Sequence, residues 1–310
     1  MRILIVKPSS LGDVVHALPT VNLIRKKFPD AHLAWLINSE LASLLKKCPL
    51  INERIEFYRR DYAKLGALLA RLHRKNFDVA IDLQGLFRRG VMTWATRAPR
   101  RIGLSDAREG ARLFYTEIAN VPRAHAVDRY LFAARHLGCA DGPVEFPLGV
   151  DERTREGLIA VNPSARWKTK LWGADKFAEL IRRLPRDRVV LTGSAAEREQ
   201  LETIAQGCRN LAGQTDLFEL AELYRRCAVV ITNDSGPMHV AAAVGTPVVA
   251  IFGPTDPALT GPYGKKHAVL RTGIPCSPCF KDYCTNPVHM ECMKLITVEQ
   301  VLAAAKPFLV

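Results

Sequence analysis

The sequence has no long apolar segment. Its longest apolar run, residues 240–252, is interrupted by Gly245 and Pro247, whereas a membrane-spanning helix needs about 20 apolar residues. Residues 1–6 form too short an apolar run for a signal peptide and are followed at once by Lys7. We therefore expect neither an integral membrane protein nor a secreted one, and predict a cytoplasmic location.

Three motifs of well-known phosphate and metal chemistry are missing. No Gly-x-Gly-x-x-Gly follows a strand-like segment, which argues against a dinucleotide dehydrogenase, and no Gly-x4-Gly-Lys-Ser/Thr is present, which argues against a P-loop NTPase. No two aspartates stand two residues apart, so the Asp-x-Asp metal clamp of one class of sugar transferases is also missing. A diphosphate would then be neutralised by helix dipoles and basic side chains rather than by Mg²⁺. We expect no cofactor.

Acidic residues are scarce relative to basic ones. The 310 residues include 44 Lys and Arg but 31 Asp and Glu, a net charge of +13. Residues 1–150 hold 24 basic and 14 acidic residues (net +10), and residues 151–310 hold 20 and 17 (net +3). A basic first half indicates phosphates, an anionic lipid surface or nucleic acid as partner, unless it is simply a solvated face. The basic pairs are scattered without a stacking-aromatic module, so we expect no nucleic acid.

Strands and helices alternate along the chain. Short apolar segments such as 3–6 and 79–83 predict buried strands, and segments with apolar residues at helical spacing follow them. This alternation predicts α/β domains built on parallel sheets with helices on both faces. Residues 138–155 interrupt it with glycine and proline and predict a linker. We therefore expect two open Rossmann-like domains, residues 1–150 and 151–310, facing each other across a cleft.

The first strand-to-helix turn carries a carboxylate. Residues 7–19 read Lys-Pro-Ser-Ser-Leu-Gly-Asp-Val-Val-His-Ala-Leu-Pro, which places Asp13 near the start of the following helix. Ligands of open parallel sheets bind beyond this edge, so Asp13 is either a helix cap or a base that accepts a proton from a ligand hydroxyl. A helix N-terminus lowers the pKa of a carboxylate, so Asp13 as a base would act late in proton transfer.

Several turns of the second domain are suited to phosphate. Residues 233–239 read Asn-Asp-Ser-Gly-Pro-Met-His, a sequence that begins a helix and leaves backbone N–H groups and the positive end of its dipole for an anion. The turn at residues 192–193 and the segment 166–170, which holds one Arg and two Lys, follow other strands. These turns predict a diphosphate site; the alternative is a set of plain, well-capped helices with His239 in the core.

Four motifs together resemble glycosyltransferase family 9, the ADP-heptose:lipopolysaccharide heptosyltransferases. They are residues 7–19, Asp82-x-Gln84-Gly-Leu86, residues 233–239 and Phe252-Gly-Pro-Thr-Asp-Pro257. The resemblance runs from residue 1 to about residue 305. It implies the GT-B architecture, with an acceptor-binding domain at 1–150 and a nucleotide-sugar (donor) domain at 151–310. We leave open whether the last helix, 298–309, packs back on the first domain.

The resemblance implies an inverting, metal-independent transfer of a heptose from ADP-heptose to the inner core of lipopolysaccharide. Asp13 matches the proposed general base of the family. The donor is assigned to Lys170, Thr192, Gly193, Asp234, Ser235, Gly236 and His239. The anionic acceptor is assigned to four basic residues of the first domain: Lys7, Arg60, Lys64 and Arg108. A basic first half also fits peripheral contact with an anionic membrane, here the inner face of the inner membrane.

Two other functions stay open at this point. A nucleotide-sugar epimerase or hydrolase on the same scaffold would bind one sugar nucleotide and need no basic acceptor surface. A non-catalytic nucleotide-sugar or lipopolysaccharide binding protein would have no use for a base at Asp13.

Four of the eight cysteines, Cys276, Cys279, Cys284 and Cys292, fall close together near His289. They offer enough ligands for a structural zinc ion, although a second Cys-x-x-Cys is lacking. The alternatives are reduced thiols that pack a loop, which a reducing compartment favours, and a disulfide. No metal is expected in catalysis.

Overall fold

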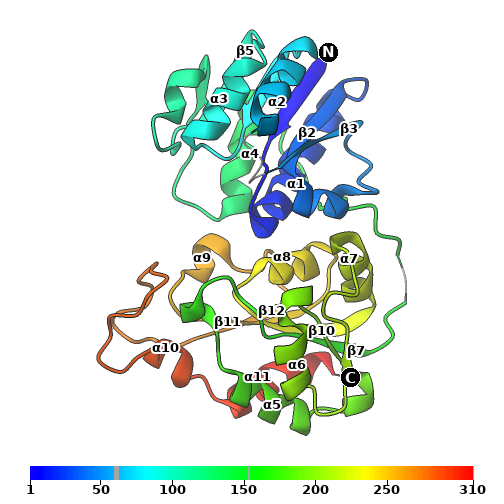
Figure 1. The fold of residues 1–310 in the computed structure, drawn as a ribbon, viewed down its shortest axis with the longest axis vertical. Helices are drawn as coiled ribbons and strands as arrows, with labels where there is room; N and C mark the ends of the chain where they lie inside the picture. Colours follow the sequence, from blue (N-terminus) through cyan, green and yellow to red (C-terminus); the bar gives the residue numbers. More distant parts are fainter. Residues whose placement is uncertain (59–62, 153, 310) are drawn as a thin grey trace. The chain divides into compact units, whose positions relative to one another are not determined.

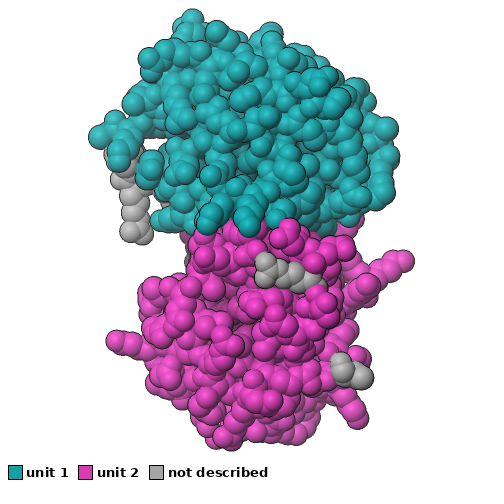
Figure 2. All heavy atoms as spheres, turned by 90° about the vertical axis from the view of Figure 1, so that its right-hand side faces the viewer, with its two compact units in different colours: residues 1–149 teal, residues 150–310 magenta. Residues whose placement is uncertain are grey.

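The computed structural model describes residues 1–58, 63–152 and 154–309. The chain divides into two compact units, Met1–Gly149 and Val150–Val310 (Figures 1 and 2). Each unit is built on its own six-stranded parallel sheet with helices on both faces. The predicted α/β class with two open parallel sheets is therefore confirmed.

The first sheet has the strand order β3-β2-β1-β4-β5-β6. Its strands are β1 (Arg2–Val6), β2 (His32–Asn38), β3 (Glu53–Phe57), β4 (Val79–Asp82), β5 (Arg100–Leu104) and β6 (Glu117–Ala119). Its helices are α1 (Leu11–Lys27), α2 (Ala63–Arg74), α3 (Phe87–Ala95) and α4 (Ala126–His136), with the 3₁₀ helices η1 (Ser39–Leu45) and η2 (Ala111–Phe114). The strand order reverses between β1 and β4, where Val6 lies beside Asp82. Such a reversal is where open sheets bind ligands.

The second sheet has the strand order β12-β11-β10-β7-β8-β9. Its strands are β7 (Leu158–Asn162), β8 (Val189–Leu191), β9 (Arg209–Asn210), β10 (Cys227–Asn233), β11 (Val248–Phe252) and β12 (His267–Arg271). Its helices are α5 (Ala174–Arg183), α6 (Arg198–Ile204), α7 (Leu217–Arg226), α8 (Gly236–Ala243), α9 (Pro257–Thr260), α10 (Glu291–Lys294) and α11 (Val298–Ala305), with η3 (Lys168–Lys170), η4 (Arg186–Arg188), η5 (Ala195–Glu197) and η6 (Lys306–Phe308). The reversal here lies between β7 and β10, where Asn162 pairs with Thr232.

The helices pack on the sheets through apolar faces. In α5, Phe177, Leu180 and Ile181 are buried while the charged residues between them are not, the pattern of an amphipathic surface helix. In α2, Leu68 and Leu72 are buried in the same way. Within the described residues, no helix combines the length and the hydrophobicity that crossing a bilayer requires.

The last helix packs inside the second unit. Val301 and Ala305 of α11 are fully buried in the same apolar cluster as Leu180 of α5 and Ile251 of β11. A capping box between Thr297 and Gln300 begins the helix. The structure thus gives α11 a place on the second sheet.

Candidate functional site

Asp13 lies in the first turn of α1, directly beyond the end of β1. Its Oδ2 accepts hydrogen bonds from the backbone N (3.0 Å) and the Oγ (2.7 Å) of Ser10, the N-cap residue of α1. The Asp13 side chain is nevertheless 35% exposed. The same carboxylate therefore both caps the helix and presents an accessible edge to a ligand.

Two buried side chains hold the other oxygen of Asp13. Tyr130 Oη, from α4, donates to Asp13 Oδ1 at 3.0 Å. Lys7 Nζ donates to Tyr130 Oη at 2.7 Å and to the Leu83 carbonyl at 2.9 Å, and lies 3.7 Å from Asp13 Oδ1. Desolvation by burial lowers the pKa of Lys7, against the charges of Asp13 and Asp82, which raise it.

The electrostatic surroundings keep Asp13 ionised. Burial on its own would raise the pKa of the Asp13 carboxyl, but the charge of Lys7 and the hydrogen bonds from Ser10 outweigh it. The net result is an Asp13 pKa well below its usual range. At neutral pH the group is ready to accept a proton, although its low pKa makes it a weak base until charge develops on the attacking oxygen.

The structure encloses the amine of Lys7 within the first unit. The Lys7 side chain is only 2% exposed, and its amine is directed at Tyr130 and Leu83. The enclosed amine orients Asp13 through Tyr130, and its assignment to the acceptor stays a prediction. Tyr130 itself was missed because residues 126–136 were not recognised as a helix, although Val127, Leu131 and Ala134 follow helical spacing.

The turn after β4 fixes the position of the Arg108 loop. Buried Asp82 accepts hydrogen bonds from Gly85 N (3.1 Å) and from Tyr115 Oη (2.7 Å). Gly85 has φ +65°, and a Cβ there would lie 3.0 Å from Ala107 Cα, so glycine permits this close approach. Arg108 N then donates to Gly85 O at 2.8 Å. The exposed Arg108 is thereby held near the carboxyl end of β4, and its contact with an acceptor stays a prediction.

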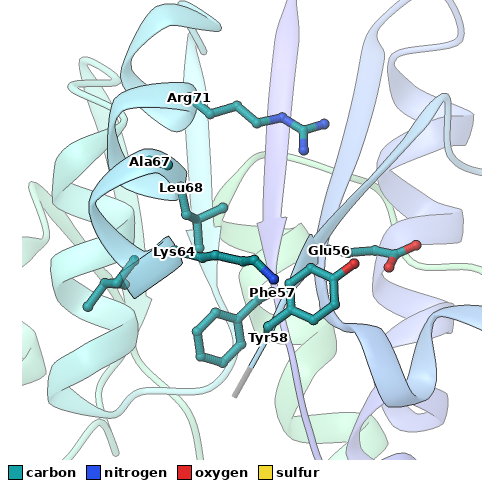
Figure 3. A pocket seen from close by; sticks show the side chains of 8 residues that line it. Glu56, Phe57, Tyr58, Lys64, Ala67, Leu68 and Arg71 are labelled. Atoms are coloured by element: carbon teal, nitrogen blue, oxygen red, sulfur yellow. The ribbon is translucent and has the colours of Figure 1, made fainter. Parts of the chain in front are cut away.

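A pocket of about 200 Å³ lies between the end of β3 and α2 (Figure 3). It is lined by Glu56, Phe57, Tyr58, Lys64, Leu65, Ala67, Leu68 and Arg71. Lys64 Nζ lies 4.7 Å from the centre of the Tyr58 ring, and Figure 3 shows the amine directed toward that ring. Phe57 and Leu68 give the pocket an apolar floor. Lys64 thus contributes a cation to the lining of this pocket. Arg60 lies outside the described residues.

In the second unit, Lys170 forms an ion pair with Asp234. Its Nζ lies 2.6 Å from Asp234 Oδ2, and the two side chains are 18% and 5% exposed. The same oxygen accepts a hydrogen bond from Thr255 Oγ1 at 2.5 Å, and the Lys170 amine lies 4.8 Å from the centre of the Trp167 ring. An ammonium group can donate three hydrogen bonds. The ion pair with Asp234 therefore orients Lys170 and leaves donor capacity for a phosphate.

Helix α8 begins beside this pair. Ser235 is its N-cap residue in extended conformation, Gly236 and Pro237 form the first turn, and His239 is 7% exposed. Asn233, just before it, accepts from Trp172 N at 3.2 Å and donates to Pro163 O at 2.7 Å. These bonds tie the Lys170 segment to the start of α8, so a cation and a helix N-terminus lie together, as the sequence predicts for an anion site.

Thr192 and Gly193 have a packing role in the structure. Thr192 is 1% exposed, and its Oγ1 is bonded to Tyr224 Oη (2.8 Å) and Asn162 Nδ2 (3.1 Å). A Cβ on Gly193 would lie 2.6 Å from Leu201 Cδ1. The Thr192 hydroxyl therefore stabilises the carboxyl end of β8, and Gly193 keeps the turn close to α6. Contact of either residue with the donor stays a prediction.

The cysteine segment does not form a metal-ligand set in the structure. Across the described ranges, no three His, Cys, Asp or Glu side chains are placed to hold one ion. Cys276 and Cys279 are exposed free thiols, and Cys284 and Cys292 are partly exposed ones. The state of the four thiols stays open among the three alternatives.

Two open parallel-sheet units, one with a carboxylate and the other with a lysine beside a helix N-terminus at the carboxyl edge of its sheet, have the architecture of a GT-B enzyme. The chain matches the model of glycosyltransferase family 9 (heptosyltransferase) over residues 65–289 and belongs to this family. It is 32% identical to lipopolysaccharide heptosyltransferase 1 of Pseudomonas aeruginosa, over 97% of this chain and 92% of that protein.

Two solved structures share the whole fold. E. coli ADP-heptose lps heptosyltransferase II has a TM-score of 0.81 and 26% identity, over 100% of this chain and 98% of that one. E. coli heptosyltransferase WaaC with ADP has a TM-score of 0.83 and 25% identity, over 99% and 100%. The resemblance to the heptosyltransferases and the GT-B architecture are thereby confirmed.

Proposed function

We propose that the chain transfers a heptose from ADP-heptose to the inner core of lipopolysaccharide, with inversion at the anomeric carbon and without a metal ion. In this proposal residues 1–150 bind the acceptor and residues 151–310 bind the donor. The observation that carries it is the Asp13 carboxylate, ionised and 35% exposed although four protein groups surround it. The names of the relatives support the two substrates.

Asp13 acts as the general base of the proposed reaction. The acceptor hydroxyl oxygen attacks the anomeric carbon of the heptose, its proton passes to Asp13, and the bond from that carbon to the diphosphate oxygen breaks. ADP leaves with the electron pair of that bond. A general base of this kind contributes about 10²–10⁴-fold to rate, and Lys7 and Tyr130 hold it in orientation.

Lys170 and the N-terminus of α8 stabilise the negative charge that grows on the leaving diphosphate. Lys170 is already oriented by Asp234 at 2.6 Å, so little reorganisation is needed when the phosphates bind. Ser235 and Gly236 bring backbone N–H groups, and His239 lies in the same helix. This set would replace a metal ion at the donor, which is why we propose metal independence.

The acceptor of the proposed reaction is anionic and lipid-linked. Lys64 in the β3–α2 pocket and the exposed Arg108 supply cations in the first unit, and the sequence assigns Arg60 to the same role. Residues 1–150 carry net +10. We propose that the enzyme works in the cytoplasm, in peripheral contact with the anionic inner face of the inner membrane.

The heptosyltransferase relatives favour this function over the two alternatives. An epimerase or hydrolase would change ADP-heptose without any acceptor, and a binding protein would leave both substrates unchanged. Each therefore has a distinct product pattern, which one assay separates.

The test is to mix the purified chain with ADP-heptose and several truncated core acceptors in the presence of EDTA. We expect ADP release and a heptose mass increment on at least one acceptor. Donor binding without a product on any acceptor would favour the binding protein, and donor conversion without acceptor would favour the epimerase or hydrolase. Transfer that requires added Mg²⁺ would contradict the proposed donor chemistry.

A further inference from the structure

Large apolar side chains lie exposed on α3 and η2 of the first unit. Leu113 is 85% exposed, Trp94 55% and Phe87 50%. The opposite side of α3 is buried, with Met92 at 0%. Exposed apolar groups of this size that gather in one place mark an interaction surface.

The two helices that carry these side chains pack against each other. Phe87, Gly90 and Trp94 are spaced i, i+3 and i+7 and share one face of α3, with Trp94 about 10 Å further along the axis. Helix η2 packs on that face: a Cβ on Gly90 would lie 2.5 Å from the Phe114 ring, and the Phe87 and Phe114 rings lie 5.3 Å apart, edge to face. Leu113 precedes Phe114 in η2, the helix that packs on this face of α3.

Exposed arginines accompany the patch. Arg88 follows Phe87, Arg112 precedes Leu113, and Arg97 lies just after the end of α3. Arg97 N donates to the carbonyl of Trp94 at 3.0 Å. Arginine beside tryptophan and leucine is the composition of surfaces that rest in the interfacial region of an anionic bilayer. We call Phe87, Arg88, Trp94, Arg97, Arg112 and Leu113 the α3–η2 patch.

We propose that the α3–η2 patch docks the enzyme on a bilayer that contains anionic lipid. The inference rests on the proposed function, because a lipid-linked acceptor requires the enzyme to work at a membrane surface. Trp94 and Leu113 enter the boundary between headgroups and acyl chains, and the arginines pair with lipid phosphates. A second copy of the chain fits the patch less well, since its arginines would repel their equivalents.

The position of α3 suits this role. The helix begins just after the Asp82–Gly85 turn, at the carboxyl end of β4, and Asp82 lies beside Val6 at the end of β1. Asp13 follows that same end of β1. The start of the patch, at Phe87, therefore lies at the sheet edge that carries the proposed base, and the rest of the patch runs back from that edge along α3.

The experiment measures co-sedimentation of the full chain with vesicles of phosphatidylcholine, with and without phosphatidylglycerol. We expect binding to the anionic vesicles and little to the neutral ones. The double variant Trp94→Ala/Leu113→Ala should lower the partition coefficient about tenfold or more. Arg88→Gln/Arg112→Gln should lower it by a similar factor, since each arginine near an anionic surface contributes about fivefold.

Matched controls come from the second unit. Leu295→Ala removes an apolar side chain that is 50% exposed, and Arg209→Gln removes an exposed arginine; both should bind vesicles like the unchanged chain. Equal binding by the patch variants and the controls would overturn the proposal. A patch variant that leaves vesicle binding unchanged but abolishes self-association in sedimentation velocity would overturn it in favour of a dimer interface.

Activity on two forms of acceptor separates this proposal from the proposed function. The patch variants should keep the kcat/KM of the unchanged chain with a water-soluble, delipidated acceptor and lose about tenfold with the same acceptor in vesicles. Equal losses on both forms would overturn membrane docking by the patch. Vesicle binding that depends on the patch, without transfer to any acceptor, would support the patch and contradict the proposed heptose transfer.

Discussion

Tyr130 Oη lies 3.0 Å from Asp13 Oδ1 and donates a hydrogen bond to it, while Lys7 Nζ donates to the same hydroxyl at 2.7 Å. The carboxylate we propose as the base is therefore oriented by a side chain from α4 that is itself fixed by a buried amine. We therefore propose that Tyr130 and Lys7 position the carboxylate of Asp13.

Replacement of Tyr130 by Phe should lower kcat about tenfold, because Asp13 Oδ1 loses its hydrogen-bond donor and the carboxylate can rotate. The KM for ADP-heptose should stay nearly unchanged. Tyr115→Phe is the matched control, since it removes a hydroxyl from the buried Asp82 instead and should leave kcat closer to that of the unchanged chain. Steady-state kinetics with each substrate varied separately makes the comparison; an equal fall in both variants would remove the special role of Tyr130.

Replacement of Lys7 by Met should change the pH profile. The charge of Lys7 lowers the pKa of Asp13 against burial, which raises it, so the variant's Asp13 pKa should rise. The acid limb of kcat/KM, which follows protonation of the base in the free enzyme, should then move to higher pH. An acid limb at the same pH in both proteins would show that Lys7 does not tune Asp13.

Replacement of Lys170 by Ala should weaken donor binding about ten- to a hundredfold, because a charge-assisted bond to phosphate contributes roughly 1.5–3 kcal/mol. Lys176→Ala is the control. Lys176 also lies over a tryptophan, 5.5 Å from the Trp172 ring centre, but bonds to the Ile296 carbonyl at 2.8 Å. Calorimetric titration with ADP measures both; comparable losses would assign the effect of Lys170 to packing.

Glu117 should make the free energy of unfolding depend on pH. Hydrogen bonds from Arg100 lower its pKa to about 2 in the folded chain, against burial, which raises it. The unfolded value is near 4.3. Its stabilisation is therefore fully present above that value and is lost as pH falls through about 2. Urea unfolding should show Glu117→Gln less stable than the unchanged chain at pH 6 and nearly equal to it at about pH 2; a constant difference would refute this.

The turns were the predictable part of the site, and their partners were not. Asp13 and residues 233–239 follow apolar strands, so their place at a sheet edge could be deduced from local pattern. Tyr130 bonds to Asp13 across 117 residues of sequence, a tertiary contact that no spacing reveals.

Burial was the other feature that residue type could not show. Lys7 and Thr192 are residue types that often contact ligands. In the structure each side chain is almost completely buried and forms hydrogen bonds to neighbouring elements. The edge strand β3, Glu-Arg-Ile-Glu-Phe, was missed for a related reason. One face of such a strand is polar, so it lacks the continuous apolar run that identifies the central strands.

The most direct test of the account is the turnover of Asp13→Asn, which keeps the size of the side chain but removes the base. Ser10→Ala is its comparison variant, because it removes one hydrogen bond to Asp13 Oδ2 but keeps the carboxylate itself. We expect Asp13→Asn to lose about 10²–10⁴-fold in kcat with unchanged affinity for ADP, and Ser10→Ala to lose far less. If Asp13→Asn retains more than about a tenth of the original turnover, well outside the loss expected for a general base, Asp13 is a helix cap and the proposed mechanism is contradicted.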